Sequence, residues 1–108
     1  MGWYSAVIIY ETEVEGRPDP SPLREESIRL VRADSEPLAW KRAEEVGRQD
    51  AHSYRNDRGE LVSWRFVQVV EVQDLCEEEL TDGVEVFSRM MRSPGAQAED
   101  PSEPSESD

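Results

Sequence analysis

The residues best suited to chemistry gather in one short polar stretch, HSYRNDRGELVSW, at residues 52–64. His52, Tyr54 and Asn56 stand at alternate positions, so a β-strand would place an imidazole, a phenol and an amide on one face, about 7 Å apart. Such groups can move protons to or from a bound molecule, and Glu60 and Arg65 across a hairpin could tune them. These five residues are therefore our candidates for contacting a ligand or a partner.

The same residues also have purely structural explanations. Asn56 is a common first residue of a turn, and Tyr54 can cover the edge of a core while its hydroxyl stays in water. A single histidine is more often a surface or capping residue than a catalytic one. We therefore favour the structural interpretation and assign no catalytic residue.

Other chemistries find less support in the residues present. A nucleophilic triad needs Ser or Cys beside its base, but Ser53 would point to the opposite strand face from His52. One histidine and one cysteine, Cys76, offer no zinc spacing, and no loop repeats carboxylates at calcium spacing. We expect no metal and no cofactor. The lone Cys76 cannot form an internal disulfide, which suits a reducing cytoplasm.

The length and charge restrict the organisation and the class of partner. The chain has 108 residues and a formal net charge of −13, from 25 acidic and 12 basic residues. We expect one domain at residues 1–92 and a disordered acidic tail, rich in Pro and Ser, at residues 93–108. The negative charge disfavours binding to nucleic acid, because phosphate recognition depends on Lys and Arg. The apolar runs are too short for a membrane span, so a cytoplasmic protein is expected.

The first half of the chain predicts two strands and a helix. Residues 3–14 are β-branched and aromatic on both faces, which is typical of an interior strand. Residues 25–33 alternate like a second, antiparallel strand. Residues 34–47 predict a helix with an N-terminal cap at Asp34 or Ser35 and a stop at Gly47. Its apolar stripe for docking on a sheet consists of Ala39, Ala43 and Val46.

The second half predicts a hairpin and a last strand. The NDRG turn at residues 56–59 joins a short strand to a long one at residues 60–75. Residues 84–91 predict a fifth strand. The resulting fold class is α+β, a five-stranded antiparallel or mixed sheet in the order β-β-α-β-β-β with one helix on one face. The face expected to meet the helix comprises Val62, Trp64, Phe66, Val70 and Val72. The opposite face, with Leu61, Val67 and Val69, is a candidate surface for a partner or for a second copy in a homodimer.

Several stretches together resemble a known bacterial family. These are WYSA, IRLVRADSEPLAWKRAEEVG, HSYRNDRGELVSWRFVQVVEV and DGVEVFSR, over about residues 3–90. The sequence is similar there to the family labelled domain of unknown function 4288. The resemblance implies a small bacterial single-domain protein and brings no activity that could be carried to any residue. The RPDPSP loop and the acidic tail depart from the family's pattern.

Two hypotheses about function follow from these observations. The first is a non-enzymatic protein-interaction module, for example an acidic inhibitor or immunity-type protein that covers a basic partner. The alternative is a small-molecule binder or acid–base enzyme that uses His52, Tyr54, Asn56 and Glu60. A related hypothesis places five arginines in one anion-binding cluster, if the second strand and the hairpin are neighbours. Those arginines are Arg29, Arg32, Arg55, Arg58 and Arg65.

Overall fold

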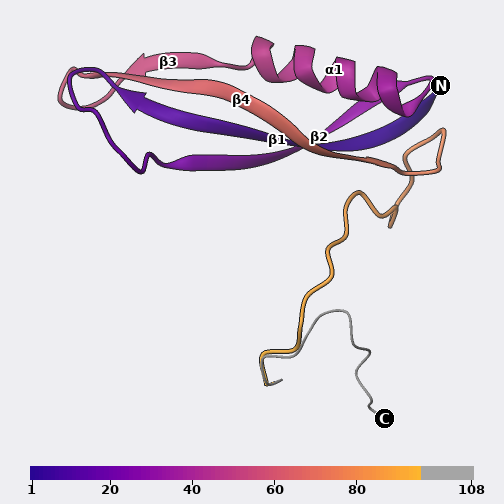
Figure 1. Cartoon of the computed structure of the whole chain (residues 1–108). Coiled ribbons are helices and arrows are strands. Elements are labelled where there is room, and N and C mark those ends of the chain that lie inside the picture. The colour runs from indigo at the N-terminus through magenta and orange to yellow at the C-terminus, as the bar shows by residue number, and fades with distance from the viewer. Residues whose placement is uncertain (96–108) are drawn as a thin grey trace.

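A computed structural model describes residues 1–95 as a curled antiparallel sheet with one helix over part of one face (Figure 1). The elements are β1 (Gly2–Val14), β2 (Arg24–Ala33), α1 (Glu36–Gln49), β3 (His52–Arg55) and β4 (Leu61–Asp74). The strands lie in the order β2-β1-β4-β3, so β1 is interior, as predicted. The α+β class is confirmed. Most of the tail predicted to be disordered, from residue 96 onward, lies outside the described residues.

The prediction of a fifth strand at residues 84–91 was wrong, because the described sheet has four strands. This segment passes across the sheet and does not run along an edge. The Gln73 side chain on β4 donates to the carbonyl of Ser88 at 3.4 Å, and Arg89 pairs with Glu26 on β2 at 3.3 Å. Since β4 and β2 flank β1, the segment lies beneath β1, out of the plane of the sheet, where its backbone cannot join the ladder of hydrogen bonds.

The helix begins and packs as its sequence predicts. Ser35 is the N-terminal cap, and its hydroxyl accepts a hydrogen bond from the Leu38 amide. Ala39 and Ala43 are fully buried against the sheet, where the small side chains allow a close approach. The core beneath the helix forms two clusters, around Ile8 and Tyr10 in one and around Tyr4 and Val31 in the other.

Gly47 does not end the helix as predicted; α1 continues to Gln49, and Asp50 is its C-terminal cap. The reason for a glycine at this position is steric. A β-carbon on Gly47 would lie 2.5 Å from the ring of Phe66, well inside van der Waals contact. The absence of a side chain at Gly47 therefore lets the last turn of α1 rest directly on β4.

Two irregularities in β4 change which of its side chains face the helix. Ile8 pairs with Val69 while Val7 pairs with Glu71, and Tyr10 pairs with Phe66 while Ile9 pairs with Gln68. Val70 and Val67 are thus extra residues in β-bulges, each of which reverses the alternation of the strand. As a result Val69 lies in the core with Ile8, and its predicted place on the opposite face was wrong.

The helix covers only one end of the sheet. In Figure 1 the β3–β4 turn and the β1–β2 loop project beyond α1 at the other end of the sheet, called here the hairpin end. The sheet face away from α1, called here the open face, carries Ile28 and Leu30 of β2, which are 45% and 40% exposed. Ser5 and Val7 of β1 lie on the same face but are buried. The exposed apolar residues of the open face are thus at its β2 edge.

Candidate functional site at the hairpin end

The turn between β3 and β4 is built around Asn56, as predicted. Its side-chain oxygen accepts hydrogen bonds from the amides of Arg58 at 2.9 Å and Glu60 at 3.0 Å. Gly59 adopts φ +78°, a left-handed conformation that costs glycine little. The position of Asn56 is therefore explained by backbone geometry, and it lies beyond the end of β3.

Glu60 joins this turn to the β1–β2 loop. Its carboxylate accepts a hydrogen bond from the Asn56 side chain at 3.0 Å and pairs with Arg17 of the loop at 3.0 Å. The hydrogen bond from Asn56 lowers the pKa of Glu60 below its ordinary value, and the charges of Arg17 and Arg58 act in the same direction. Glu60 thus remains ionised and holds two loops together.

His52 and Tyr54 form a stacked pair on β3. Their ring centroids are 6.2 Å apart at an interplanar angle of 23°. The ring of His52 is oriented by a hydrogen bond from Nδ1 to the carbonyl of Asp50 at 3.0 Å. Their cross-strand partners are Trp64 and Val62, so the pair lies on the face that α1 covers elsewhere. Tyr54 is nevertheless 48% exposed.

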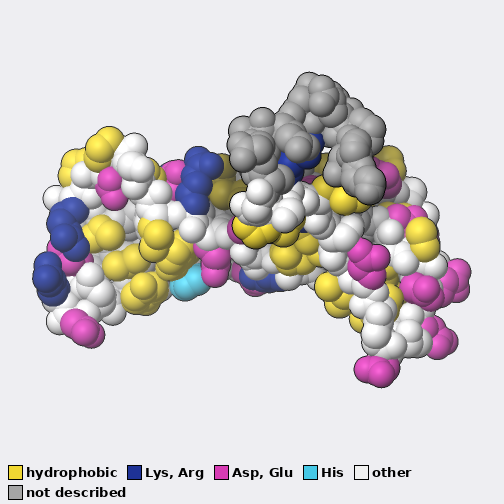
Figure 2. Space-filling view, turned by 90° about the horizontal axis from the view of Figure 1, so that it is seen from below, with side chains coloured by type: hydrophobic (Ala, Val, Ile, Leu, Met, Phe, Trp, Pro, Cys, Tyr) yellow, Lys and Arg dark blue, Asp and Glu magenta, His cyan; other side chains and the backbone are white. Residues whose placement is uncertain are grey.

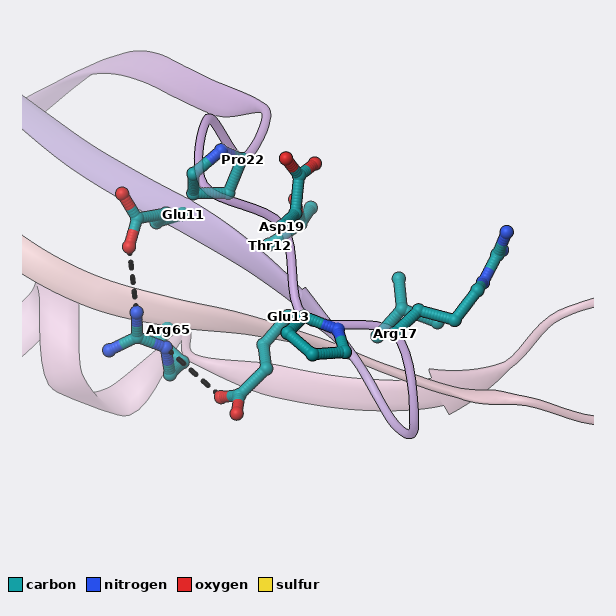
Figure 3. A pocket seen from close by; sticks show the side chains of 9 residues that line it. Glu11, Thr12, Glu13, Arg17, Asp19, Pro22 and Arg65 are labelled. Atoms are coloured by element: carbon teal, nitrogen blue, oxygen red, sulfur yellow. Dashed lines mark hydrogen bonds and ion pairs between the residues drawn. The ribbon is translucent and has the colours of Figure 1, made fainter.

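Arg65 lies on the opposite face of the sheet from His52 and Tyr54. It pairs with Glu11 at 2.7 Å and with Glu13 at 3.3 Å (Figure 3). Glu11 also pairs with Arg24 at 2.9 Å, so one carboxylate lies between two guanidinium groups. Arg65, Glu11 and Glu13 border, together with the β1–β2 loop, a hollow of about 590 Å³. Glu11 was not predicted as a site residue. Its presence as an acidic residue in a strand predicted to be interior is the feature of the sequence that could have identified it.

The five arginines proposed as an anion-binding cluster do not meet. β2 and β3 are the two edges of the sheet, which separates Arg29 and Arg32 from the hairpin. Arg29 pairs with Asp50, and the guanidinium of Arg32 lies 5.2 Å from the ring centroid of Trp3.

A smaller group of basic residues does form at the hairpin end. It borders a hollow of about 530 Å³ whose lining residues are Arg17, Tyr54, Arg55, Asn56, Asp57 and Arg58. Figure 2 shows basic side chains at this end of the open face and acidic side chains gathered at the other end. The hairpin end therefore offers positive groups to a ligand although the whole chain is acidic.

Two further features bear on the class of protein. Within residues 1–95, no three His, Cys, Asp or Glu side chains are arranged as metal ligands. In the same part of the chain, α1 is neither long nor apolar enough to cross a membrane.

The fold and these contacts define a small α+β domain whose candidate site is a polar, exposed hairpin at the end of a curled sheet. The chain belongs to the family described as Domain of unknown function (DUF4288), whose model matches residues 3–88. The resemblance stated from the sequence is thereby confirmed, and the match includes all five elements except the first residue of β1, together with residues 84–88 of the segment beneath β1. No curated protein and no solved structure matches the chain.

Proposed function

We propose that the protein is a non-enzymatic interaction module of the bacterial cytoplasm, which binds a partner protein at the hairpin end. The observation that carries this proposal is the stacked pair of His52 and Tyr54. Tyr54 is 48% exposed and belongs to neither core cluster. An aromatic pair outside the core, held in one orientation before binding, is typical of the residues that dominate protein interfaces.

The geometry of the pair favours binding a protein surface. The hydrogen bond to Asp50 and the contact with His52 restrict the ring positions, so little conformational entropy remains to be lost on binding. Tyrosine offers a large apolar contact area together with a hydroxyl that can hydrogen-bond. A partner with a shallow apolar depression would therefore gain most from contacting Tyr54.

The net charge of −13 supports a partner that is basic overall, as in an inhibitor or immunity-type complex, and that extends along the sheet from Tyr54 to the acidic end. Where it meets the arginines of the hairpin end, such a partner would carry apolar or acidic groups. A segment at the other end of the sheet carries six acids and no base. None of the ion pairs between described residues includes one of these acids. They are Asp74, Glu77, Glu78, Glu79, Asp82 and Glu85. Unpaired acidic side chains increase the rate at which a basic protein associates.

Site-specific cross-linking in the native host tests this proposal. A photoreactive residue replaces Tyr54 in one variant and Leu38, which is 49% exposed on the helix, in the control. One dominant adduct is expected at position 54 and not at position 38. The purified partner should then bind the Tyr54→Ala variant about tenfold more weakly or worse. Identical adducts at both positions, or equal affinity for the variant, would contradict the proposal.

A second candidate function is binding of a small anion in the hollow at the hairpin end. Arg17, Arg58 and Tyr54 line this hollow and could bind a phosphate or carboxylate. His52 and Glu60 are not among its lining residues, so the four groups considered for acid–base chemistry do not converge there. Titration with inorganic phosphate, followed by NMR, should shift the Arg58 amide in the wild type. In the Arg58→Ala variant, the same titration should leave the amide signals of Tyr54 and Asn56 unshifted.

A further inference from the structure

We propose that two copies of the chain pair along β2. The two β2 strands would lie antiparallel about a two-fold axis at Arg29 and would join two four-stranded sheets into one continuous sheet. This inference is independent of the proposed function, because it concerns the edge of the sheet opposite to β3.

The outer edge of β2 has backbone groups ready for such pairing. The Thr12 amide donates to the carbonyl of Leu23 at 2.9 Å, and the pairing of β1 with β2 continues without a break to Gly2 and Ala33. Because hydrogen-bonded pairs alternate along an antiparallel ladder, every second residue of β2 directs its amide and carbonyl away from β1. These residues are Arg24, Glu26, Ile28, Leu30 and Arg32.

Within residues 1–95, no backbone hydrogen bond from a turn, loop or cap uses these outward groups. The edge is ten residues long, whereas the other edge strand, β3, has four residues. Long exposed edges with apolar side chains are the strand edges that pair with other chains. β2 is therefore the better edge for joining two copies.

The side chains of these residues form a self-complementary pattern. Continued to Asp34, the order along the edge is basic, acidic, apolar, apolar, basic, acidic. A two-fold axis at Arg29 places Ile28 opposite Leu30 of the second copy. It also places Glu26 opposite Arg32 and Arg24 opposite Asp34 of the second copy. Every charged residue of the pattern thus faces an opposite charge, with apolar residues at the centre.

The neighbouring register is less favourable. An axis at Ile28 would place Arg24 opposite Arg32 of the second copy, a like-charge pair that destabilises a sheet. In the proposed register the two copies of Arg29 approach each other on the helix side. Each is already paired with Asp50 of its own chain, which offsets that repulsion.

The exposure of the edge also fits a second copy. Ile28 and Leu30 are 45% and 40% exposed, and pairing would cover four such side chains in the dimer. The ion pair that Glu26 makes within its own chain, with Arg89 at 3.3 Å, is exposed on both sides, whereas Arg24 pairs with the largely buried Glu11 and keeps that pair when Asp34 of the second copy approaches it. Exposed ion pairs contribute little stability, so their exchange for contacts between copies costs little.

A charge exchange tests the proposed register. The full chain should sediment as a dimer at about 100 μM protomer, where mass action favours association. Glu26→Arg and Arg32→Glu, made singly, each create two like-charge contacts in the dimer and should raise its dissociation constant about tenfold or more. The double variant restores opposite charges and should dimerise like the wild type.

Glu78→Arg provides a control with the same change of charge as Glu26→Arg, away from β2, and should leave dimerisation unchanged. Thermal unfolding checks that each variant is folded. Hydrogen exchange provides a second readout: the outward amides of Ile28 and Leu30 should exchange more slowly in the wild type than in the single variants. A monomer at about 100 μM, or a dimer that the single variants leave intact, would overturn the proposal.

Discussion

The hydroxyl of Tyr10 donates a 3.0 Å hydrogen bond to the carbonyl of Gly47, which joins the central strand to the last turn of the helix. Both residues are buried, and the ring of Phe66 lies against both of them, edge-on to Tyr10. The contact between α1 and the sheet therefore has two requirements. Gly47 must lack a side chain so that the Phe66 ring fits against it, and Tyr10 must carry the hydroxyl that bonds to the helix.

Gly47→Ala should destabilise the protein, although alanine normally stabilises a helix relative to glycine by about 1 kcal/mol. The added β-carbon would meet the Phe66 ring at 2.5 Å, and such overpacking costs about 1–3 kcal/mol. Urea unfolding measures the difference. Gln49→Ala, at an exposed position of the same turn, is the control and should change stability little. A more stable Gly47→Ala variant would show that the last turn does not rest on β4.

Tyr10→Phe should cost about 1–2 kcal/mol at neutral pH, because the carbonyl of Gly47 loses its buried partner. Burial raises the pKa of the Tyr10 phenol, with Arg29 opposing in part. The unfolded chain then loses this proton near pH 10 while the folded protein keeps it, so stability is lost as the pH rises further. Unfolding between pH 8 and about pH 11 should therefore be less pH-dependent in the variant. If the wild type and the Tyr10→Phe variant showed the same pH dependence, burial would not raise the pKa of the Tyr10 phenol.

Glu60→Gln should destabilise the protein at neutral pH and make no difference in acid. The pKa of Glu60 is lowered in the folded state, chiefly by the hydrogen bond from Asn56. Its contribution is thus present above the unfolded pKa of about 4.3 and is lost as the pH falls through the lower folded value. Unfolding at pH 7 and about pH 3 measures this. Glu78→Gln, in the acidic segment, serves as the control and should show no difference at either pH.

Glu11→Gln should destabilise the protein by about 1 kcal/mol, because the two arginines that flank it lose a charged acceptor. The Glu11 side chain is 15% exposed, whereas that of Glu13 is 66% exposed, so Glu13→Gln should have almost no effect. A double-mutant cycle with Arg65→Met isolates the interaction between Glu11 and Arg65. A coupling energy near zero would mean that the pair is only a surface contact.

Ser5→Ala should leave the protein equally stable or slightly more stable. The Ser5 hydroxyl is buried on the open face, and no hydrogen-bond partner for it exists among residues 1–95. Removing a buried hydroxyl without a partner removes a desolvation cost. Ser27→Ala is the comparison and should lower the stability, because the hydroxyl of Ser27 accepts a hydrogen bond from Arg29 at 2.8 Å. A marked loss of stability in Ser5→Ala alone would indicate a partner for that hydroxyl.

Local signals in the sequence predicted the parts of the fold that depend on near neighbours in the chain. The Ser35 cap lies three residues from the amide it binds, and the Asn56 turn satisfies amides two and four residues away. The run of β-branched and aromatic residues that predicted β1 and the alternation that predicted β2 are also properties of adjacent residues. For the candidate site, these signals correctly assigned Asn56 to a turn.

Interactions between distant segments decided the rest. Two bulges in β4 moved Val69 to the core, and Gly47 is required by Phe66, nineteen positions later in the numbering. Arg65 lies on the opposite face from His52 and Tyr54 because its neighbour Trp64 is the cross-strand partner of His52, and on that face it pairs with Glu11.

The sequence by itself determined where the helix, the turns and four of the strands begin and end, within a few residues, and that the domain is α+β. It did so because capping, turn chemistry and side-chain alternation act over a few residues. Only the tertiary structure decided which face each β4 side chain occupies, that residues 84–91 cross the sheet, and which site residues meet. These depend on register and on contacts between segments far apart in the chain, which local patterns do not encode.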